Sequence, residues 1–166
     1  MRAPGDAVLR RLAKRVAMRL RAASETIATA ESCTGGYLAK CLTDLPGSSD
    51  YFDRGWVTYS NSAKQAELAV GLHLIDQRGA VSESVALAMV RGALRASRAD
   101  HAIAVTGIAG PTGGTPDKPV GTVWIAWGSR TRGRLTVAAR HFRFKGGRDA
   151  VRRRTVAAAL RGVLTT

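Results

Sequence analysis

The sequence predicts a three-layer α/β/α domain with a mixed, mostly parallel sheet that contains one antiparallel hairpin. Short apolar segments typical of buried strands alternate with longer segments of helical periodicity. Aromatic residues make up only 5% of the chain and glycine occurs 18 times, which suits helices packed closely on a sheet. At 166 residues the chain fits a single domain, residues 1–166, without repeats or linkers.

The first half of the chain alternates helices with strands. Asp6 is a candidate N-cap for an opening helix, because apolar residues recur behind it at helical spacing as far as Leu20. Asn61 occupies the same position before a later helix, which Gly71 is well suited to end. In order, we expect the opening helix, strand 26–30, helix 37–42, strand 56–59 and helix 61–69.

The second half supplies the rest of the sheet and two more helices. Ser82 is a candidate N-cap for the clearest helix in the sequence, which is rich in apolar and small residues. In order, we expect helix 83–97, strand 102–105, loop 106–119, strand 120–127, a turn at 129–133, strand 135–144 and a last helix from about 148.

The net charge of +14 is concentrated at the two ends of the chain. Residues 1–22 carry seven basic and one acidic side chain, and residues 128–154 carry ten basic and one acidic. The middle, residues 23–127, has eight basic and ten acidic groups. Basic ends attract nucleic acid whether or not this is their function, so we favour a solvated arginine-rich surface.

Composition disfavours several classes of protein. No apolar run approaches the ~18 residues of a membrane span, and arginines and a lysine interrupt the N-terminal apolar stretches, unlike a signal peptide. Cys33 and Cys41 are too few for a disulfide framework, so we expect a cytoplasmic protein. His73, His101 and His141 are too scattered to share a helix face, so we expect no metal site.

The first polar cluster, Ser32 to Gly36, follows strand 26–30. A helix that begins there offers unpaired backbone N–H groups and its positive dipole end, which suit an oxyanion or a phosphate. Ser32 is equally well interpreted as a nucleophile or as an ordinary cap. Cys33 is a rival nucleophile, because helix N-termini activate thiolates, although a small buried residue in a tight turn is the simpler interpretation.

The second polar cluster, Thr58 to Lys64, follows strand 56–59. Lys64 falls in the first turn of the next helix, where the dipole disfavours a cation. Once partly desolvated, such a lysine has a lowered pKa and accepts a proton near neutral pH. Ser32 and Lys64 are therefore a candidate nucleophile and base if they meet in one dry pocket. A lysine that faces solvent is the alternative.

The third polar cluster is the glycine-rich loop Thr106 to Gly114. Its composition resembles that of a phosphate-cradling loop, but it lacks the Gly-Lys-Ser/Thr ending of a Walker loop and does not fit Gly-x-Gly-x-x-Gly. Kinase and dehydrogenase functions are therefore disfavoured. Arg148 is placed to add a guanidinium to an anion held there, although it also fits a basic surface.

Together, these clusters resemble the C-terminal domain of the competence/damage-inducible CinA family, in the family's order and across about residues 26–160. The stretches that carry the resemblance are Thr29-Ala30-Glu31-Ser32-Cys33-Thr34-Gly35-Gly36, Val57-Thr58-Tyr59-Ser60-Asn61 with Lys64, Gly79-Ala80-Val81-Ser82, Thr106-Gly107-Ile108-Ala109-Gly110-Pro111 with Gly113-Gly114-Thr115, Lys118-Pro119-Val120-Gly121-Thr122-Val123, and Gly147-Arg148. Stand-alone members of this family are nicotinamide-nucleotide amidases.

The resemblance implies hydrolysis of nicotinamide mononucleotide to nicotinate mononucleotide and ammonia, as in pyridine-nucleotide salvage, without a metal or an organic cofactor. It implies Ser32 as the nucleophile and Lys64 and Tyr59 as its catalytic partners. Substrate-binding residues are then expected in the three clusters and at the start of the last helix. They are Thr34, Gly35, Gly36, Ser60, Asn61, Thr106, Gly107, Gly110 and Arg148.

Two other functions are compatible with the sequence. Phe142 and Phe144 lie among arginines, which allows a nucleic-acid-binding module, although such interleaved aromatic residues are few. A non-catalytic nucleotide-binding protein on the same fold is the second alternative. The small residues of helix 83–97 suit packing on another chain, so we also expect a homo-oligomer, with a dimer favoured.

Overall fold

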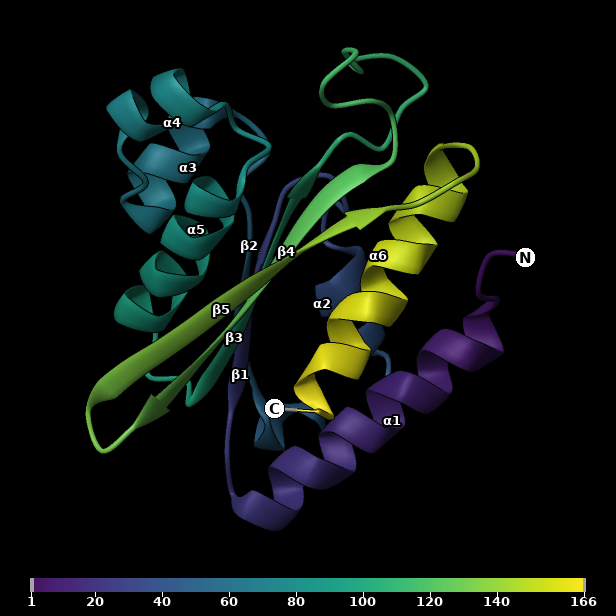
Figure 1. Cartoon of the computed structure of the whole chain (residues 1–166). Coiled ribbons are helices and arrows are strands. Elements are labelled where there is room, and N and C mark those ends of the chain that lie inside the picture. The colour runs from purple at the N-terminus through teal and green to yellow at the C-terminus, as the bar shows by residue number, and fades with distance from the viewer. Residues whose placement is uncertain (1, 166) are drawn as a thin grey trace.

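The structure, a computed structural model of the whole chain, describes residues 2–165 and consists of one sheet with helices on both faces (Figure 1). Its elements are α1 (Asp6–Ala23), β1 (Ile27–Glu31), α2 (Tyr37–Thr43), the 3₁₀ helix η1 (Ser48–Asp50), β2 (Phe52–Val57), α3 (Asn61–Leu68), α4 (Leu72–Arg78), α5 (Glu83–Ala96), β3 (His101–Gly107), β4 (Thr122–Thr131), β5 (Arg134–Arg143) and α6 (Arg148–Val163). The predicted three-layer α/β/α architecture is confirmed.

The five-stranded sheet has the order β2-β1-β3-β4-β5. β1 is parallel to both of its neighbours, and its last residue, Glu31, is in register with Val57 of β2 and Val105 of β3. The carboxyl ends of these three strands therefore lie at one level of one edge. The chain leaves β1 for β2 on one side and returns to β3 on the other, which makes this edge a switch point of the kind where α/β proteins bind ligands.

The other half of the sheet is antiparallel. β4 pairs antiparallel with β5, which is the predicted hairpin, and also with β3. The second pairing follows from the connection, because the chain passes from β3 to β4 through loop 108–121 without a crossover helix. The hairpin turn is confined to Arg132 and Gly133, both at positive φ, so the strands extend further into the predicted turn than the sequence indicated.

Each face of the sheet carries its own hydrophobic core. On one face, residues such as Leu12 of α1, Leu38 of α2 and Leu160 of α6 pack over the sheet. On the other, Leu68 of α3 and Met89 of α5 belong to a second cluster. Figure 1 shows the two groups of helices, with the long loop between β3 and β4 projecting beyond the strand ends.

Three predicted helix signals proved wrong in detail. Asp6 does not cap α1, because Gly5 precedes the helix and Asp6 is its first residue. Asn61 does not cap α3, because the Ser60 hydroxyl one residue earlier accepts the Ala63 N–H. Gly71 does not end α3, which closes at Ala69 in the left-handed conformation. The Ser82 cap of α5 is confirmed, since its hydroxyl accepts the Val85 N–H.

Two elements differ from the sequence prediction because they are little buried. β2 begins at Phe52 rather than at residue 56, and most of its residues are exposed at the sheet edge, so they carry no apolar signal. The short helix α4 begins directly after Gly71 and was not predicted. Ile75 is its only fully buried residue, and one buried position does not produce a helical periodicity.

The small residues of α5 are used within the chain. An added Cβ at Gly92 would lie 2.1 Å from the carbonyl oxygen of Leu68, so glycine allows α5 and α3 to cross closely. Ala86 and Ala93 are fully buried in the same core. This packing accounts for the composition of α5 without a partner chain, and the homo-oligomer stays a prediction.

Within residues 2–165, no helix has both the length and the apolar content needed to cross a bilayer. The same part of the chain contains no group of three or more His, Cys, Asp or Glu side chains placed to hold a metal ion. Cys33 and Cys41 are free and buried.

Candidate active site

Ser32 and Lys64 meet at the carboxyl edge of the parallel strands. Ser32 is the first residue after β1, and Lys64 reaches it from the first turn of α3. Lys64 Nζ lies 3.1 Å from Ser32 Oγ, within hydrogen-bond distance. Both residues are buried, with 8% of Ser32 and 1% of Lys64 exposed. The predicted pair therefore forms one buried contact.

Two backbone carbonyls hold the lysine in place. Lys64 Nζ donates to the carbonyl of Thr58 at 2.8 Å and to that of Tyr59 at 3.3 Å. These residues follow β2, and the Thr58 N–H is itself bonded to the carbonyl of Glu31 at the end of β1. The strand pairing thus extends one residue past β2 and fixes the position of both acceptors relative to Ser32.

The environment of Lys64 favours its neutral form. Burial lowers the pKa of Lys64 below its ordinary value of 10.5. No carboxylate forms an ion pair with this amine among the described residues. A neutral amine has two N–H groups and one lone pair, so two carbonyl acceptors leave the lone pair for the Ser32 hydroxyl. The arrangement suits a general base.

Cys33, the rival nucleophile, lies in the opposite situation. Burial raises the pKa of the Cys33 thiol to about 12, and the nearby carboxylate of Glu31 acts in the same direction. The thiol is therefore protonated near neutral pH and is a weak nucleophile. Of the two neighbouring candidates, the geometry favours Ser32.

The N-terminus of α2 is occupied by a buried carboxylate rather than left open for an oxyanion. Glu31 is fully buried, and its side chain accepts the backbone N–H groups of Leu38 at 3.0 Å and Ala39 at 2.8 Å. The N–H of Gly35 is bonded to the carbonyl of Ser32, and that of Tyr37 to the carbonyl of Thr34. The N–H groups of Gly35, Tyr37, Leu38 and Ala39 are therefore engaged within the protein rather than free for a ligand.

A pocket of about 300 Å³ opens over the Ser32–Lys64 contact. It is lined by residues from all three polar clusters. Those that we predicted as site residues are Ser32, Tyr59, Asn61, Lys64, Thr106, Gly107, Gly110 and Arg148. Thr34, Gly35, Gly36 and Ser60 do not line it. Thr34 is fully buried beside the pocket, with its carbonyl bonded to Arg152, and Ser60 is used as the cap of α3.

Arg148 joins two sides of the pocket. Its guanidinium donates to the Gly110 carbonyl at 3.0 Å and to the Tyr59 hydroxyl at 2.9 Å. Tyr59 is 57% exposed and lines the pocket, and the hydrogen bond that it forms with Lys64 is through its backbone carbonyl. Because a guanidinium has five N–H donors, several of those on Arg148 remain for an anionic ligand.

Other residues of the site were missed or misassigned from the sequence. The Thr106 hydroxyl donates to the Ala80 carbonyl at 2.8 Å, so it holds the segment before α5 against the pocket. Ala80, Val81 and Thr112 line the pocket but offer no chemical signal in the sequence. Glu31 had such a signal, since a carboxylate at the end of an apolar strand requires a partner.

The fold and the site together define an α/β protein with a buried serine–lysine pair at its ligand-binding edge, the arrangement expected of a hydrolase that acts through a serine. Sequence comparison agrees with this class and narrows it. The chain belongs to the CinA C-terminal domain family, whose sequence model matches residues 9–166.

Individual relatives cover nearly the whole chain. It is 53% identical over 153 residues to the nicotinamide-nucleotide amidohydrolase PncC of Pseudomonas putida, covering 92% of this chain and 93% of that protein. It is 50% identical over 155 residues to the PncC of Escherichia coli K12, covering 93% and 92%. The crystal structure of competence/damage inducible protein CihA from Agrobacterium tumefaciens is similar, with a TM-score of 0.90, 44% identity and coverage of 98% and 96%.

Proposed function

We propose that the chain is a nicotinamide-nucleotide amidohydrolase, which converts nicotinamide mononucleotide and water into nicotinate mononucleotide and ammonia. The observation that carries the proposal is the buried 3.1 Å contact between Ser32 Oγ and Lys64 Nζ. The substrate class is supported by the names of relatives that are 50–53% identical to this chain and are matched over more than nine-tenths of their length. The pocket over this contact supplies a concave site for such a ligand.

In the first step, Ser32 attacks the carboxamide carbon of the substrate. Neutral Lys64 takes the hydroxyl proton as the new carbon–oxygen bond forms, directly and without a relay through Tyr59. The product of this step is a tetrahedral intermediate with an oxyanion. The backbone N–H of Cys33, which follows the nucleophile and lines the pocket, is the donor that we assign to the oxyanion.

In the second step, the carbon–nitrogen bond breaks. The Lys64 ammonium gives its proton to the leaving nitrogen, which departs as ammonia and leaves an acyl ester on Ser32. Water then attacks the ester carbon while Lys64 again accepts a proton. Collapse of the second intermediate returns the proton to Ser32 Oγ and releases the carboxylate.

Arg148 is the group that we assign to the substrate phosphate. It lines the same pocket as Ser32, and two of its N–H groups are already fixed by Gly110 and Tyr59. A guanidinium held in this way is pre-oriented for a phosphate oxygen. Asn61 and the loop at Gly107 line the pocket between the two ends and are assigned to the ribose and the ring.

The direct test measures ammonia release from nicotinamide mononucleotide, the riboside and free nicotinamide with the purified chain. We expect activity on the mononucleotide. The riboside has no phosphate for Arg148 to bind, so we expect its kcat/KM to be at least about tenfold lower. Equal activity on all three substrates would contradict phosphate recognition, and no activity on any of them would contradict the function.

The nucleophile is tested by two single substitutions. We expect Ser32→Ala to lose roughly 10⁴-fold or more in kcat while it still binds the mononucleotide. Cys33→Ala keeps activity, because the buried thiol is protonated and does not react. An active Ser32→Ala enzyme together with an inactive Cys33→Ala enzyme would move the nucleophile to the thiol.

The role of Tyr59 is tested by Tyr59→Phe, which removes the acceptor of one Arg148 hydrogen bond. If the tyrosine only orients the guanidinium at the mouth, KM for the mononucleotide rises several-fold and kcat changes little. A large fall in kcat with unchanged KM would instead assign Tyr59 to proton transfer.

The proposal includes a cytoplasmic location and a homodimer. Two buried free thiols fit a reducing compartment. Light scattering on the purified 17.6 kDa chain tests the second part, since a dimer has twice this mass.

A further inference from the structure

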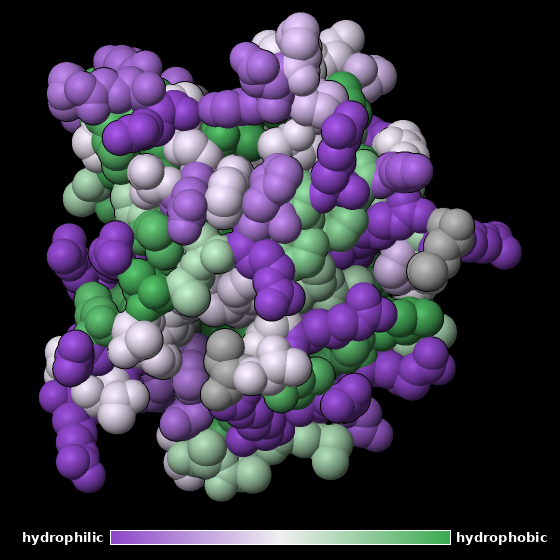
Figure 2. Space-filling view, in the orientation of Figure 1, coloured by the Kyte–Doolittle hydropathy of each residue, from purple (hydrophilic) through white to green (hydrophobic). Residues whose placement is uncertain are grey.

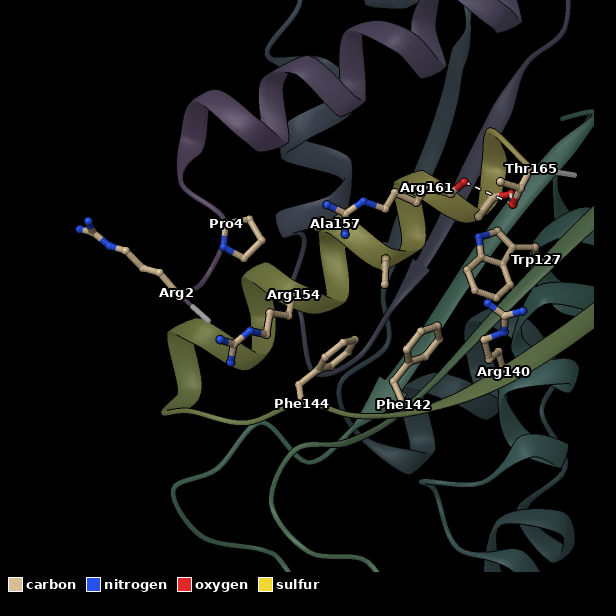
Figure 3. A pocket seen from close by; sticks show the side chains of 12 residues that line it. Arg2, Pro4, Trp127, Arg140, Phe142, Phe144, Arg154, Ala157, Arg161 and Thr165 are labelled. Carbon is tan, nitrogen blue, oxygen red and sulfur yellow. Dashed lines mark hydrogen bonds between the residues drawn. The ribbon is translucent and has the colours of Figure 1, made fainter.

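A second groove lies outside the catalytic pocket. It has a volume of about 410 Å³ and runs between β5 and α6, and none of its lining residues lines the pocket at Ser32. Figure 3 shows Phe142 of β5 and Phe144, just after that strand, directed towards α6, with Trp127 beside the C-terminal end of that helix. The catalytic mechanism uses no part of this groove.

The floor of the groove is a built aromatic surface. The rings of Phe142 and Phe144 are stacked with centroids 5.3 Å apart, and Trp127 meets Phe142 edge-on at 6.5 Å. The indole N–H of Trp127 donates to the Ala159 carbonyl of α6 at 2.9 Å. An added Cβ at Gly162 would lie 2.2 Å from the indole ring, so this glycine is what allows the ring its position. The three rings are each partly exposed.

The rim of the groove is basic. Arg2, Arg140, Arg154 and Arg161 line it, and no aspartate or glutamate does. Among the described residues, the arginines that form ion pairs with carboxylates are Arg21, Arg54 and Arg153, and none of them lines the groove. Among residues 2–165, Arg2, Arg140 and Arg161 form no ion pair. Figure 2 shows hydrophilic side chains around a more hydrophobic strip where β5 passes α6.

We propose that this groove binds a nucleoside phosphate, with its base on the aromatic floor and its phosphate at the arginines. Flat apolar rings and guanidinium groups are complementary to the two ends of such a ligand. The volume suits one nucleotide. Because the aromatic side chains form one cluster rather than a series along an extended path, the site fits a free nucleotide better than a strand of nucleic acid. The site is independent of the amidohydrolase function.

The test is calorimetric titration of the full chain with adenosine monophosphate, adenosine and inorganic phosphate. We expect saturable binding of the monophosphate at one groove site, and at least about tenfold weaker binding of adenosine and of phosphate, which each fill half of the site. The double substitution Arg140→Gln/Arg161→Gln weakens monophosphate binding at least tenfold by the same reasoning. Phe142→Leu, which keeps an apolar side chain, removes the stacking surface and weakens monophosphate binding too.

Two controls separate the groove from other basic surfaces. Arg11→Gln/Arg15→Gln removes the same charge from exposed positions of α1 outside the groove, and we expect it to bind as the wild type does. Arg148→Ala disables the anion site of the catalytic pocket and should leave groove binding intact. Circular dichroism of each variant establishes that it is folded.

Three results would overturn the proposal. They are the absence of saturable binding by adenosine monophosphate, binding that is lost in Arg148→Ala but kept in the groove variants, and equal weakening by the α1 control. An oligonucleotide of roughly 12 residues that binds far more tightly than the monophosphate, with a steep dependence on salt, would assign the groove to single-stranded nucleic acid instead.

Discussion

The chain buries two charged side chains on either side of its candidate nucleophile, and it treats them differently. Glu31, which precedes Ser32, receives two backbone N–H groups from the N-terminus of α2. Lys64, which contacts Ser32 from α3, is bonded to a hydroxyl and two carbonyls and forms no ion pair with a carboxylate within residues 2–165. The first charge is compensated by the fold and the second is not.

This difference separates a structural group from a reactive one. A carboxylate at a helix N-terminus is stabilised by unpaired N–H groups and by the helix dipole. An amine without an anion in a buried site is stable mainly in its neutral form, so its pKa falls and it becomes a base. The same degree of burial therefore fixes a loop in one case and activates a nucleophile in the other.

Among the tests of this difference between Glu31 and Lys64, replacing Lys64 with methionine is expected to change the measured quantities most. The rate of amide hydrolysis falls by roughly 10²–10⁴-fold, because the general base is lost. The free energy of unfolding rises by about 1 kcal/mol or more, because a buried amine gives way to an apolar group of similar length. Urea unfolding and the ammonia assay measure the two effects on one sample.

The matched control is Lys40→Met, at an exposed lysine of α2 that pairs only with Asp44. It should change neither the rate nor, beyond about 0.5 kcal/mol, the stability. A destabilised Lys64→Met protein would mean that the amine is compensated after all.

Glu31→Gln is expected to have the next largest effect. It lowers the free energy of unfolding, whereas Lys64→Met raises it. The amide keeps one oxygen for the two N–H groups of α2 and presents donors of its own to them, so the helix start loses a charge-assisted hydrogen bond. We expect a loss of about 1–3 kcal/mol in the free energy of unfolding. A variant as stable as the wild type would show that α2 does not depend on this carboxylate.

The smallest expected effect is the change in kcat/KM and in stability with pH as Lys64 titrates. Because the folded-state pKa lies below the ordinary 10.5, the neutral fraction of Lys64 and kcat/KM both rise with pH and level off above the folded-state pKa. Burial of the charged amine costs stability in full below the folded-state pKa. That cost diminishes as the pH rises from there to the ordinary value and is absent above it.

Subtracting the unfolding free energies of Lys64→Met from those of the wild type at each pH isolates this contribution. A difference that does not vary with pH would contradict a lowered pKa.

The sequence was sufficient for the alternation of strands and helices and for the meeting of Ser32 with Lys64. Both residues follow parallel strands, and the carboxyl ends of neighbouring parallel strands lie at one edge. The sequence was not sufficient to predict which backbone N–H groups near the nucleophile are free for a ligand. Thr34, Gly35 and Gly36 looked like an open helix start, but the Glu31 carboxylate reaches that helix. Whether the Glu31 carboxylate or a ligand accepts these N–H groups depends on the strand twist and on the placement of α2. The local sequence does not encode either.

The excess of basic residues, which the catalytic motifs do not require, has a consequence at the open side of the sheet. β5 is an edge strand, so one row of its backbone N–H and C=O groups lacks a neighbouring strand. Arg134, Arg140 and Arg143 lie along it, and guanidinium groups keep their charge throughout the range in which proteins fold. A second copy that approached edge to edge would meet the same charges, and this repulsion guards the chain against fibrillar stacking.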